Sequence, residues 1–233
     1  MKKTAILLGA LALFLAQSVG AQTFTPSNLN TDQLPESPAS FSYEGLEKTW
    51  SATFTIGGEN ETWFFGPYIG SFPGTPSFNM YCVDFLAGVS NTAWDVNISP
   101  VTGDLSLTRI KDQATYRQMA FLSSLFSAEN GMTRNNWSAL HAAIWTLAGA
   151  NITAIAGTGI AVDVMDLVTH YLNLAASTSF NASNWYVLTA VDPFTLQRQE
   201  FMIEVSEPAA LILLLSGLLG VVYLARRRST GLA

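Results

Sequence analysis

The chain contains one cysteine, Cys82, and two histidines, His141 and His170, so few positions offer a thiol or an imidazole for chemistry. An imidazole beside a cysteine lowers the pKa of the thiol and makes it a nucleophile for acyl transfer. Cys82 and His141 are therefore the candidate catalytic pair. Asp84 and Asn79, which lie close to the cysteine in the sequence, are candidates for the group that orients the base.

A packing role for both residues is the alternative. An unpaired cysteine commonly behaves as a small buried apolar side chain. His141 lies four residues from both Trp137 and Trp145, so on a helix its ring falls in a row between two indoles. This placement favours a packed, partly buried imidazole over a reactive one.

Metal and cofactor sites are not expected. The histidines and the cysteine are too few for a zinc set. Four side chains could offer oxygens to calcium: Asp95, Asn97, Asp163 and Asp166. They do not lie in an Asp-x-Asp-x-Asp-Gly loop, so we expect them to be ordinary surface groups. The sequence also lacks a Gly-x-Ser-x-Gly elbow and a glycine-rich phosphate loop.

The spacing of apolar residues predicts which elements position these side chains. Alternation predicts strands at 50–56, 62–65, 78–85, 93–98, 185–191 and 199–205, and helical spacing predicts helices at 110–125, 137–147 and 162–174, with a Gly/Pro loop at 66–76. We expect an α+β fold, an antiparallel β-sandwich or barrel with inserted helices.

The amino terminus has the pattern of a secretory signal. Lys2 and Lys3 precede an apolar run over 5–16, and small residues end at Ala21. We expect a signal helix in residues 1–21, handled by the translocon and signal peptidase, then a flexible leader at 22–48 and one extracellular module at 49–205.

The carboxyl terminus contains an uncharged run of 17 residues, 209–225. As a helix this run is about 25 Å long at about 1.5 Å per residue, close to the hydrocarbon thickness of a bilayer, about 30 Å. Arg226, Arg227 and Arg228 follow it and would remain on the cytoplasmic side. A transmembrane helix is expected; the alternative is a helix buried in the core.

Residues 206–228 resemble the PEP-CTERM sorting signal of bacterial surface and exopolysaccharide-associated proteins. Glu207 and Pro208 match its usual Val-Pro-Glu-Pro opening, whereas Ser206 replaces the first proline. The resemblance implies that an exosortase recognises Glu207 and Pro208 and removes the helix. The membrane anchor would then be transient, and the product would remain at the cell surface or in the extracellular matrix.

Two further stretches, Tyr-Cys-Val-Asp at 81–84 and His-Ala-Ala-Ile-Trp at 141–145, together resemble the thioester domains of bacterial surface adhesins. In that family the cysteine thiol condenses with a glutamine amide of a Gln-x-Ala-x-Trp stretch. Here the glutamine position falls on His141, whose imidazole has no acyl carbon, so this thioester cannot form. Gln113 and Gln118 are the alternative acyl donors.

The part of the chain between the two ends contains six basic residues and all seventeen acidic residues, so its net charge is −11. This charge argues against nucleic acid and anionic lipid as partners. The six tryptophans are expected mainly in the core. In the adjacent aromatics at 63–65, the side chains cannot all face one side of a strand, so one face meets a second layer, a partner or solvent.

The most consistent interpretation is an exported protein, sorted by exosortase, with a structural or adhesive role in an exopolysaccharide or biofilm layer. Extracellular polysaccharide is an expected partner, and the sequence does not identify a ligand. The alternative class is a secreted enzyme, either an acyl transferase using Cys82 and His141 or a glycan hydrolase. The carboxylates of a hydrolase cannot be identified from sequence, because their spacing is spatial.

Overall fold

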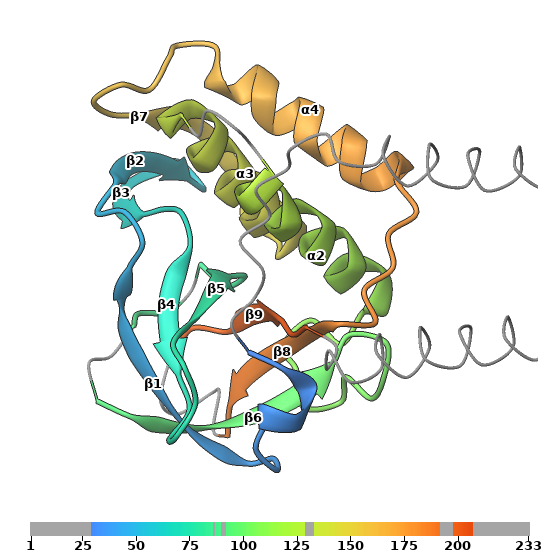
Figure 1. Ribbon diagram of the computed structural model, residues 1–233. Helices are drawn as coiled ribbons and strands as arrows, with labels where there is room; N and C mark the ends of the chain where they lie inside the picture. Colours follow the sequence, from blue (N-terminus) through green and yellow to red (C-terminus); the bar gives the residue numbers. More distant parts are fainter. Residues whose placement is uncertain (1–28, 86, 90–91, 129–132, 192–197, 207–233) are drawn as a thin grey trace, which may run out of the picture.

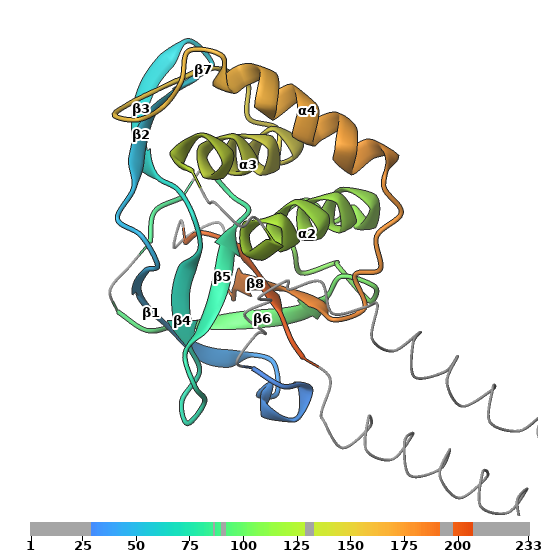
Figure 2. The same ribbon diagram turned by 45° about the horizontal axis from the view of Figure 1, so that its top comes forward.

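The computed structural model describes residues 29–85, 87–89, 92–128, 133–191 and 198–206. Three helices lie together over a β-barrel, with a small sheet at one end of the helical layer (Figures 1 and 2). In chain order the elements are η1 (Thr31–Gln33), β1 (Ala39–Leu46), β2 (Ser51–Ile56), β3 (Glu59–Phe64), β4 (Tyr68–Ser71), β5 (Phe78–Cys82), β6 (Trp94–Pro100), α2 (Gln113–Ala128), α3 (Arg134–Leu147), β7 (Ile152–Ala156), α4 (Val164–Ser177), β8 (Trp185–Ala190) and β9 (Phe201–Glu204).

The six barrel strands follow the order β1-β4-β5-β9-β8-β6, and β6 pairs with β1 to close the ring. Every neighbouring pair is antiparallel. Aromatic rings fill the interior around Phe41, whose centroid lies 4.9 Å from that of Trp94 and 5.9 Å from that of Phe72. The expected antiparallel β-architecture with helices is confirmed, and it is a barrel.

The expected flexible leader at 22–48 is wrong where β1 lies. This strand is hydrogen-bonded between β4 and β6, and its Phe41 side chain is fully buried in the barrel. Before it, the Leu29 carbonyl accepts a hydrogen bond of 2.9 Å from the Ser206 N–H. The ordered module therefore includes residues that the Pro- and Ser-rich composition assigned to a linker.

Strand β4 also corrects an expectation, since it occupies part of the predicted loop at 66–76. Its Gly70 is required by packing, because a Cβ there would lie 2.6 Å from Cε2 of Phe41. A glycine at this position lets the Phe41 ring cross the strand inside the barrel. Gly70 contributed to the prediction of a loop, yet in the structure its lack of a side chain is what allows β4 to form.

The small sheet has the order β3-β2-β7. The predicted hairpin is confirmed, with β2 and β3 joined by Gly57 and Gly58 at φ 61° and 95°. Positive φ at both turn residues is typical of the two-residue turns that match strand twist. Strand β7, which follows α3 and pairs with β2, was not predicted.

The three expected helices are confirmed. Thr133 caps α3, since its hydroxyl accepts a hydrogen bond from the Asn136 N–H. Helix α3 packs between α2 and α4 and against the small sheet, where Phe54 meets Trp145 at 5.0 Å between centroids. On the barrel side, Tyr81 of β5 stacks on Phe126 of α2 at 5.4 Å.

The expected signal helix in residues 1–21 and the expected transmembrane helix at 209–225 lie outside the described residues. Within the described part of the chain, no helix has both the length and the apolar character needed to cross a membrane.

Candidate functional site

Cys82 is the last residue of β5 and pairs with Phe201 of β9. Its side chain is fully buried, and its thiol donates a hydrogen bond of 2.9 Å to the Asp84 carbonyl. Burial raises the pKa of the Cys82 thiol to about 12, although the Trp145 side chain and the Arg109 charge oppose the rise. The Trp145 indole nitrogen itself makes no hydrogen bond of normal geometry with the described residues. The thiol is therefore protonated and shielded at neutral pH.

His141 lies in the middle of α3 and is also fully buried. Its Nδ1 accepts a hydrogen bond of 2.8 Å from the Gly66 N–H, so the proton of the neutral ring is on Nε2. Among the described residues, Nε2 has no hydrogen-bond partner. Burial lowers the pKa of His141 to about 3, so the ring stays neutral in the fold.

The immediate surroundings of His141 are aromatic. Its ring stacks on Trp145 at 5.1 Å and 17°, and Phe126 lies at the same centroid distance. The edge of Tyr68 approaches at 6.2 Å. Of the two indoles predicted to flank His141, Trp145 stacks on its ring, whereas the described residues show no ring contact between His141 and Trp137. The ring is packed on several sides.

The described residues show no hydrogen bond between the Cys82 thiol and the His141 imidazole. Each group has another partner, the Asp84 carbonyl for the thiol and the Gly66 N–H for the ring. Asp84 does not orient the ring either, because its carboxylate forms an ion pair with Arg109. In this arrangement neither nucleophile nor base is prepared for acyl transfer.

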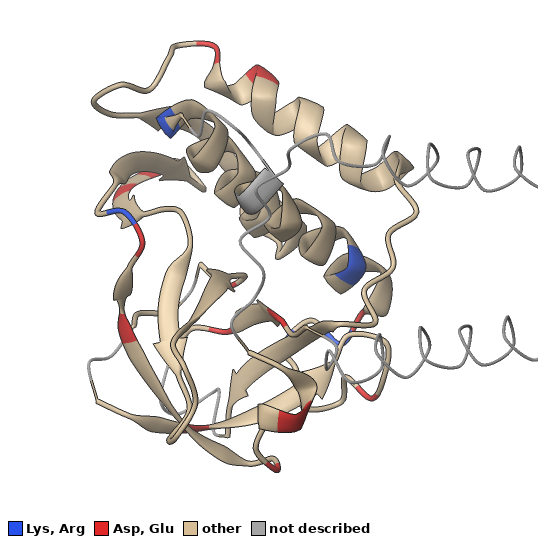
Figure 3. Ribbon diagram, viewed as in Figure 1, with Lys and Arg blue, Asp and Glu red and all other residues tan. Residues whose placement is uncertain are grey.

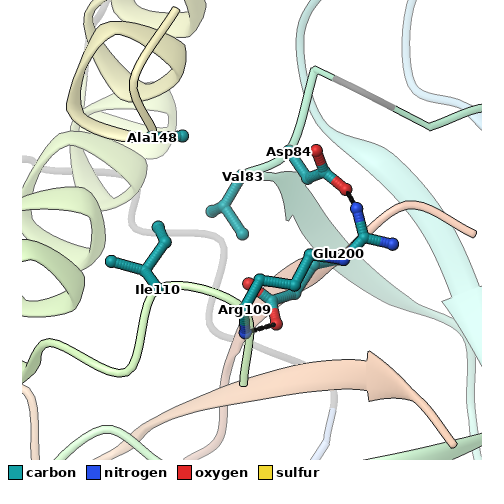
Figure 4. Close-up of a pocket in the computed structure, with 6 residues that line it drawn as sticks. All are labelled: Val83, Asp84, Arg109, Ile110, Ala148 and Glu200. Atoms are coloured by element: carbon teal, nitrogen blue, oxygen red, sulfur yellow. Dashed lines mark hydrogen bonds and ion pairs between the residues drawn. The ribbon is translucent and has the colours of Figure 1, made fainter. Parts of the chain in front are cut away.

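The Asp84–Arg109 ion pair lines a pocket of about 330 Å³ near the buried cysteine (Figure 4). Val83, Ile110 and Ala148 form its apolar wall. In Figure 4 the Arg109 guanidinium points toward the Asp84 carboxylate, away from that apolar wall. The Arg109 guanidinium also donates to the carbonyl of Arg198.

Glu200 lines the same pocket and is almost completely buried. Its carboxylate accepts hydrogen bonds from the Tyr116 and Thr189 hydroxyls, both at 2.5 Å, and from the Arg109 N–H at 3.1 Å. Burial raises the pKa of Glu200, and these three donors oppose that rise. The cluster joins the segment before β9 to β8, to α2 and to the loop before α2, so its geometry is that of a structural connection.

Sequence reasoning did not identify Arg109 or Glu200. Two features of the sequence pointed weakly to them. Basic residues are rare, only six in the body, and Glu200 directly precedes the apolar β9. A charged residue at the start of a buried strand needs a partner. The sequence does not show which residue supplies it.

The remaining candidates are not brought together with Cys82. Gln113 donates its amide N–H to the Val101 carbonyl at 3.0 Å, and Gln118 lines a separate hollow between α2 and the end of α4. In the described residues no group of three or more His, Cys, Asp or Glu side chains could hold a metal ion.

Most of the tryptophans are in the core, as predicted. Trp137, Trp145 and Trp185 are fully buried, and Trp94 is 6% exposed. The aromatic stretch at 63–65 divides as strand geometry requires, with Phe65 fully buried and Phe64 49% exposed.

The predicted sorting residues Glu207 and Pro208 and the predicted membrane stop, Arg226, Arg227 and Arg228, lie outside the described residues. Ser206 is described, and it forms an isolated parallel bridge with Asn30.

No protein-family model matches the chain, and no curated protein matches it. Among solved structures, the N-terminal thioester domain of the fibronectin-binding protein SfbI from Streptococcus pyogenes is similar. The TM-score is 0.44 and the identity 11%, and the match covers 78% of this chain and 99% of that domain.

Proposed function

We propose that this chain is an exported surface or matrix protein, delivered by an N-terminal signal and a PEP-CTERM-like tail. Its barrel domain has a structural or adhesive role in an extracellular polysaccharide layer and does not catalyse a reaction. In this proposal the tail anchors the chain in the membrane until an exosortase removes it, and the partners are the export machinery, the exosortase and the polysaccharide.

One observation carries the non-enzymatic part of the proposal. Cys82 is the only cysteine of the chain and His141 is one of its two histidines. Both side chains are fully buried, and they hydrogen-bond to the Asp84 carbonyl and the Gly66 N–H rather than to each other. A thiol whose pKa is raised to about 12 holds almost no thiolate at neutral pH. The residues best suited to covalent chemistry thus stabilise the core.

The reactivity of the thiol tests this observation. We expect Cys82 in the folded full chain, held in detergent, to resist alkylation between pH 7 and 9.5 and to react fully in denaturant. A variant that combines Cys82→Ala with Ser183→Cys is the control, because position 183 is exposed and its thiol should react at once. Rapid alkylation of native Cys82 would instead support a secreted acyl-transfer enzyme.

Delivery needs its own experiment in the native host. Replacing Glu207 and Pro208 with alanine should block removal of the tail and leave the chain in the membrane fraction. Replacing Glu59 and Pro73, an exposed acid and an exposed proline of the body, is the matched control and should leave processing unchanged. Normal surface delivery of the Glu207/Pro208 variant would contradict the sorting proposal.

A further inference from the structure

The outer face of the small sheet carries a row of hydroxyl groups. Thr53 pairs with Thr62 of β3 and with Ala156 of β7, so these three side chains share one face. The two threonine hydroxyls are exposed and lie 3.2 Å apart. The opposite face, which carries the buried Phe54 and Ala52, packs against the helices. The threonine face therefore remains open to solvent.

A hollow of about 230 Å³ lies at the end of this row. It forms because β7 ends at Ala156, so that Ser51 on β2 has a cross-strand neighbour only on β3. Gly157 turns the chain away close to β2, where its Cβ position would lie 3.4 Å from Cα of Ala52. Four of its lining residues carry a hydroxyl group: Ser51, Thr53, Thr62 and Thr158.

Arg134, at the start of α3, also lines the hollow. The central carbon of its guanidinium lies 5.3 Å from the centroid of the Trp50 ring, and one Nη donates to the Thr158 carbonyl at 3.1 Å. Among the described residues Arg134 is in no ion pair, whereas Arg109 is paired with Asp84. The indole and the carbonyl hold the guanidinium in place without neutralising its charge.

Strand alternation directs both carboxylates of β3, Glu59 and Glu61, away from the threonine face. Glu61 pairs with Phe54, so its side chain points to the face opposite that of Thr62. Glu61 is held there by a hydrogen bond of 2.8 Å from the Trp63 indole N–H. On the threonine side, Phe64 pairs with Ser51 and exposes about half of its ring. An aromatic ring thus lies beside the hydroxyl-lined hollow.

We propose that this hollow binds a single uronate residue of an otherwise largely neutral extracellular polysaccharide. The Arg134 guanidinium would bind the carboxylate, the threonine and serine hydroxyls would bind sugar hydroxyls, and the Phe64 ring would pack on a neighbouring sugar. This inference rests on the proposed function, because it names the polysaccharide class that the domain recognises.

The net charge of the protein favours a polysaccharide with few carboxylates. Acidic positions are spread over the barrel and the helices, and basic positions are few (Figure 3). A uniform polyuronate would be repelled by a body with a net charge of −11. An isolated carboxylate flanked by neutral sugars would meet the Arg134 guanidinium without bringing further negative charge to the surface.

The test is calorimetry on the full chain, produced without an exosortase and held in detergent. The probe is a xylo-oligosaccharide carrying one glucuronate, and the same oligosaccharide with its carboxyl reduced is the neutral control. Arg134→Gln should weaken binding of the acidic probe about tenfold to a hundredfold, the range expected for a charge-assisted hydrogen bond. Arg117→Gln is the matched control, because Arg117 is exposed and lines a different hollow on α2.

Carboxyl reduction should weaken binding to the unaltered chain by a similar factor and have little further effect on the Arg134→Gln variant. Thr62→Val, which keeps the β-branched shape, should weaken binding of both probes. Equal affinity for the acidic and reduced probes, equal affinity of the Arg134→Gln variant, or no binding of either probe would overturn the inference.

A second measurement separates this inference from the proposed function. The unaltered chain and the Arg134→Gln variant are passed over immobilised polysaccharide from the native host. If both chains are retained and bind the acidic probe with the same affinity, the hollow is not the uronate site, and the proposed function still stands. Binding of the acidic probe without retention on host polysaccharide would keep the uronate site and reject the proposed matrix role.

Discussion

Nδ1 of His141 accepts a hydrogen bond of 2.8 Å from the backbone N–H of Gly66, a residue 75 positions earlier in the chain. The bond fixes α3 to the segment between β3 and β4. His141→Leu removes the acceptor and leaves a buried N–H without a partner, which should lower the free energy of unfolding by about 1–3 kcal/mol. Urea denaturation measures the change. His141→Gln, which can still accept through its side-chain oxygen, should lose less, and an equal loss would argue against this role of the bond.

The buried imidazole also predicts how stability depends on pH. The pKa of His141 is about 3 in the fold and near 6.5 in the unfolded chain. Between these values the unfolded chain binds more protons, so acid favours unfolding. This contribution to stability is complete above pH 6.5 and is lost as the pH falls toward 3, by at most about 1.4 kcal/mol per pH unit. Urea titrations between pH 4.5 and 7 measure the slope.

The His141→Leu variant is the control for that slope, because Glu200 acts in the opposite direction. Burial raises the pKa of the Glu200 carboxyl, so its contribution is complete below its unfolded pKa and is lost as the pH rises through its folded pKa. The difference between the unaltered chain and His141→Leu removes this effect. If both chains have the same slope, the histidine is not the group that titrates.

Gly66 has a second role, at the closest contact between this segment and α3. Its φ is 110°, and a Cβ there would lie 2.4 Å from Cε3 of Trp137, inside the core. Gly66→Ala must displace a buried indole and strain the backbone, so we expect a loss of about 3 kcal/mol or more in unfolding free energy. Gly58→Ala is the matched control, since φ is 95° but no atom lies within 4 Å of its Cβ position. Equal losses would show that backbone strain alone accounts for the effect.

The Tyr116–Glu200 hydrogen bond is the strongest candidate for coupling α2 to the barrel. Tyr116→Phe removes a donor from a buried carboxylate and should lower the free energy of unfolding by about 1.5–3 kcal/mol. A double-mutant cycle with Glu200→Gln, followed by urea denaturation, measures the coupling. Tyr186→Phe, at a half-buried tyrosine with no such partner among the described residues, should change stability by less than about 0.5 kcal/mol. Additive losses in the cycle would contradict a direct interaction.

The elements that could be predicted from the sequence are those with strong local signals. The hairpin of β2 and β3 has two alternating runs around a Gly-Gly turn, and α2 and α3 have long helical periodicity. Strand β1 does alternate, with Ala39, Phe41 and Tyr43 between polar residues, but the Pro- and Ser-rich stretch before it led to the expectation of a leader. What makes it a strand is pairing with β4 and β6, and β6 lies far along the chain. The alternation favours a strand, but it does not show with which strands β1 pairs.

The candidate site was predictable in its residue types and not in its contacts. Cys82 and His141 stand out by rarity, and their burial agrees with the packing alternative. Arg109 meets Asp84 across 25 positions and Glu200 across 91. The barrel fold brings these residues, which are far apart in the sequence, into contact. The position of Arg134 beside the hollow likewise depends on the fold, which brings the start of β2 and the end of β7 next to it.

The role of β1 predicts where the chain can be shortened. A chain without residues 1–28 retains the whole barrel and should unfold cooperatively in urea. A chain that also lacks residues 29–48 loses β1, and with it the buried Phe41 and the closing pair with β6. Removal of a buried phenylalanine alone costs about 3–5 kcal/mol, a large part of the stability of a typical domain. We therefore expect the shorter chain to lose cooperative unfolding and its near-ultraviolet circular dichroism. A cooperative, native-like transition without residues 29–48 would mean that these residues are indeed a leader and that the barrel forms without β1.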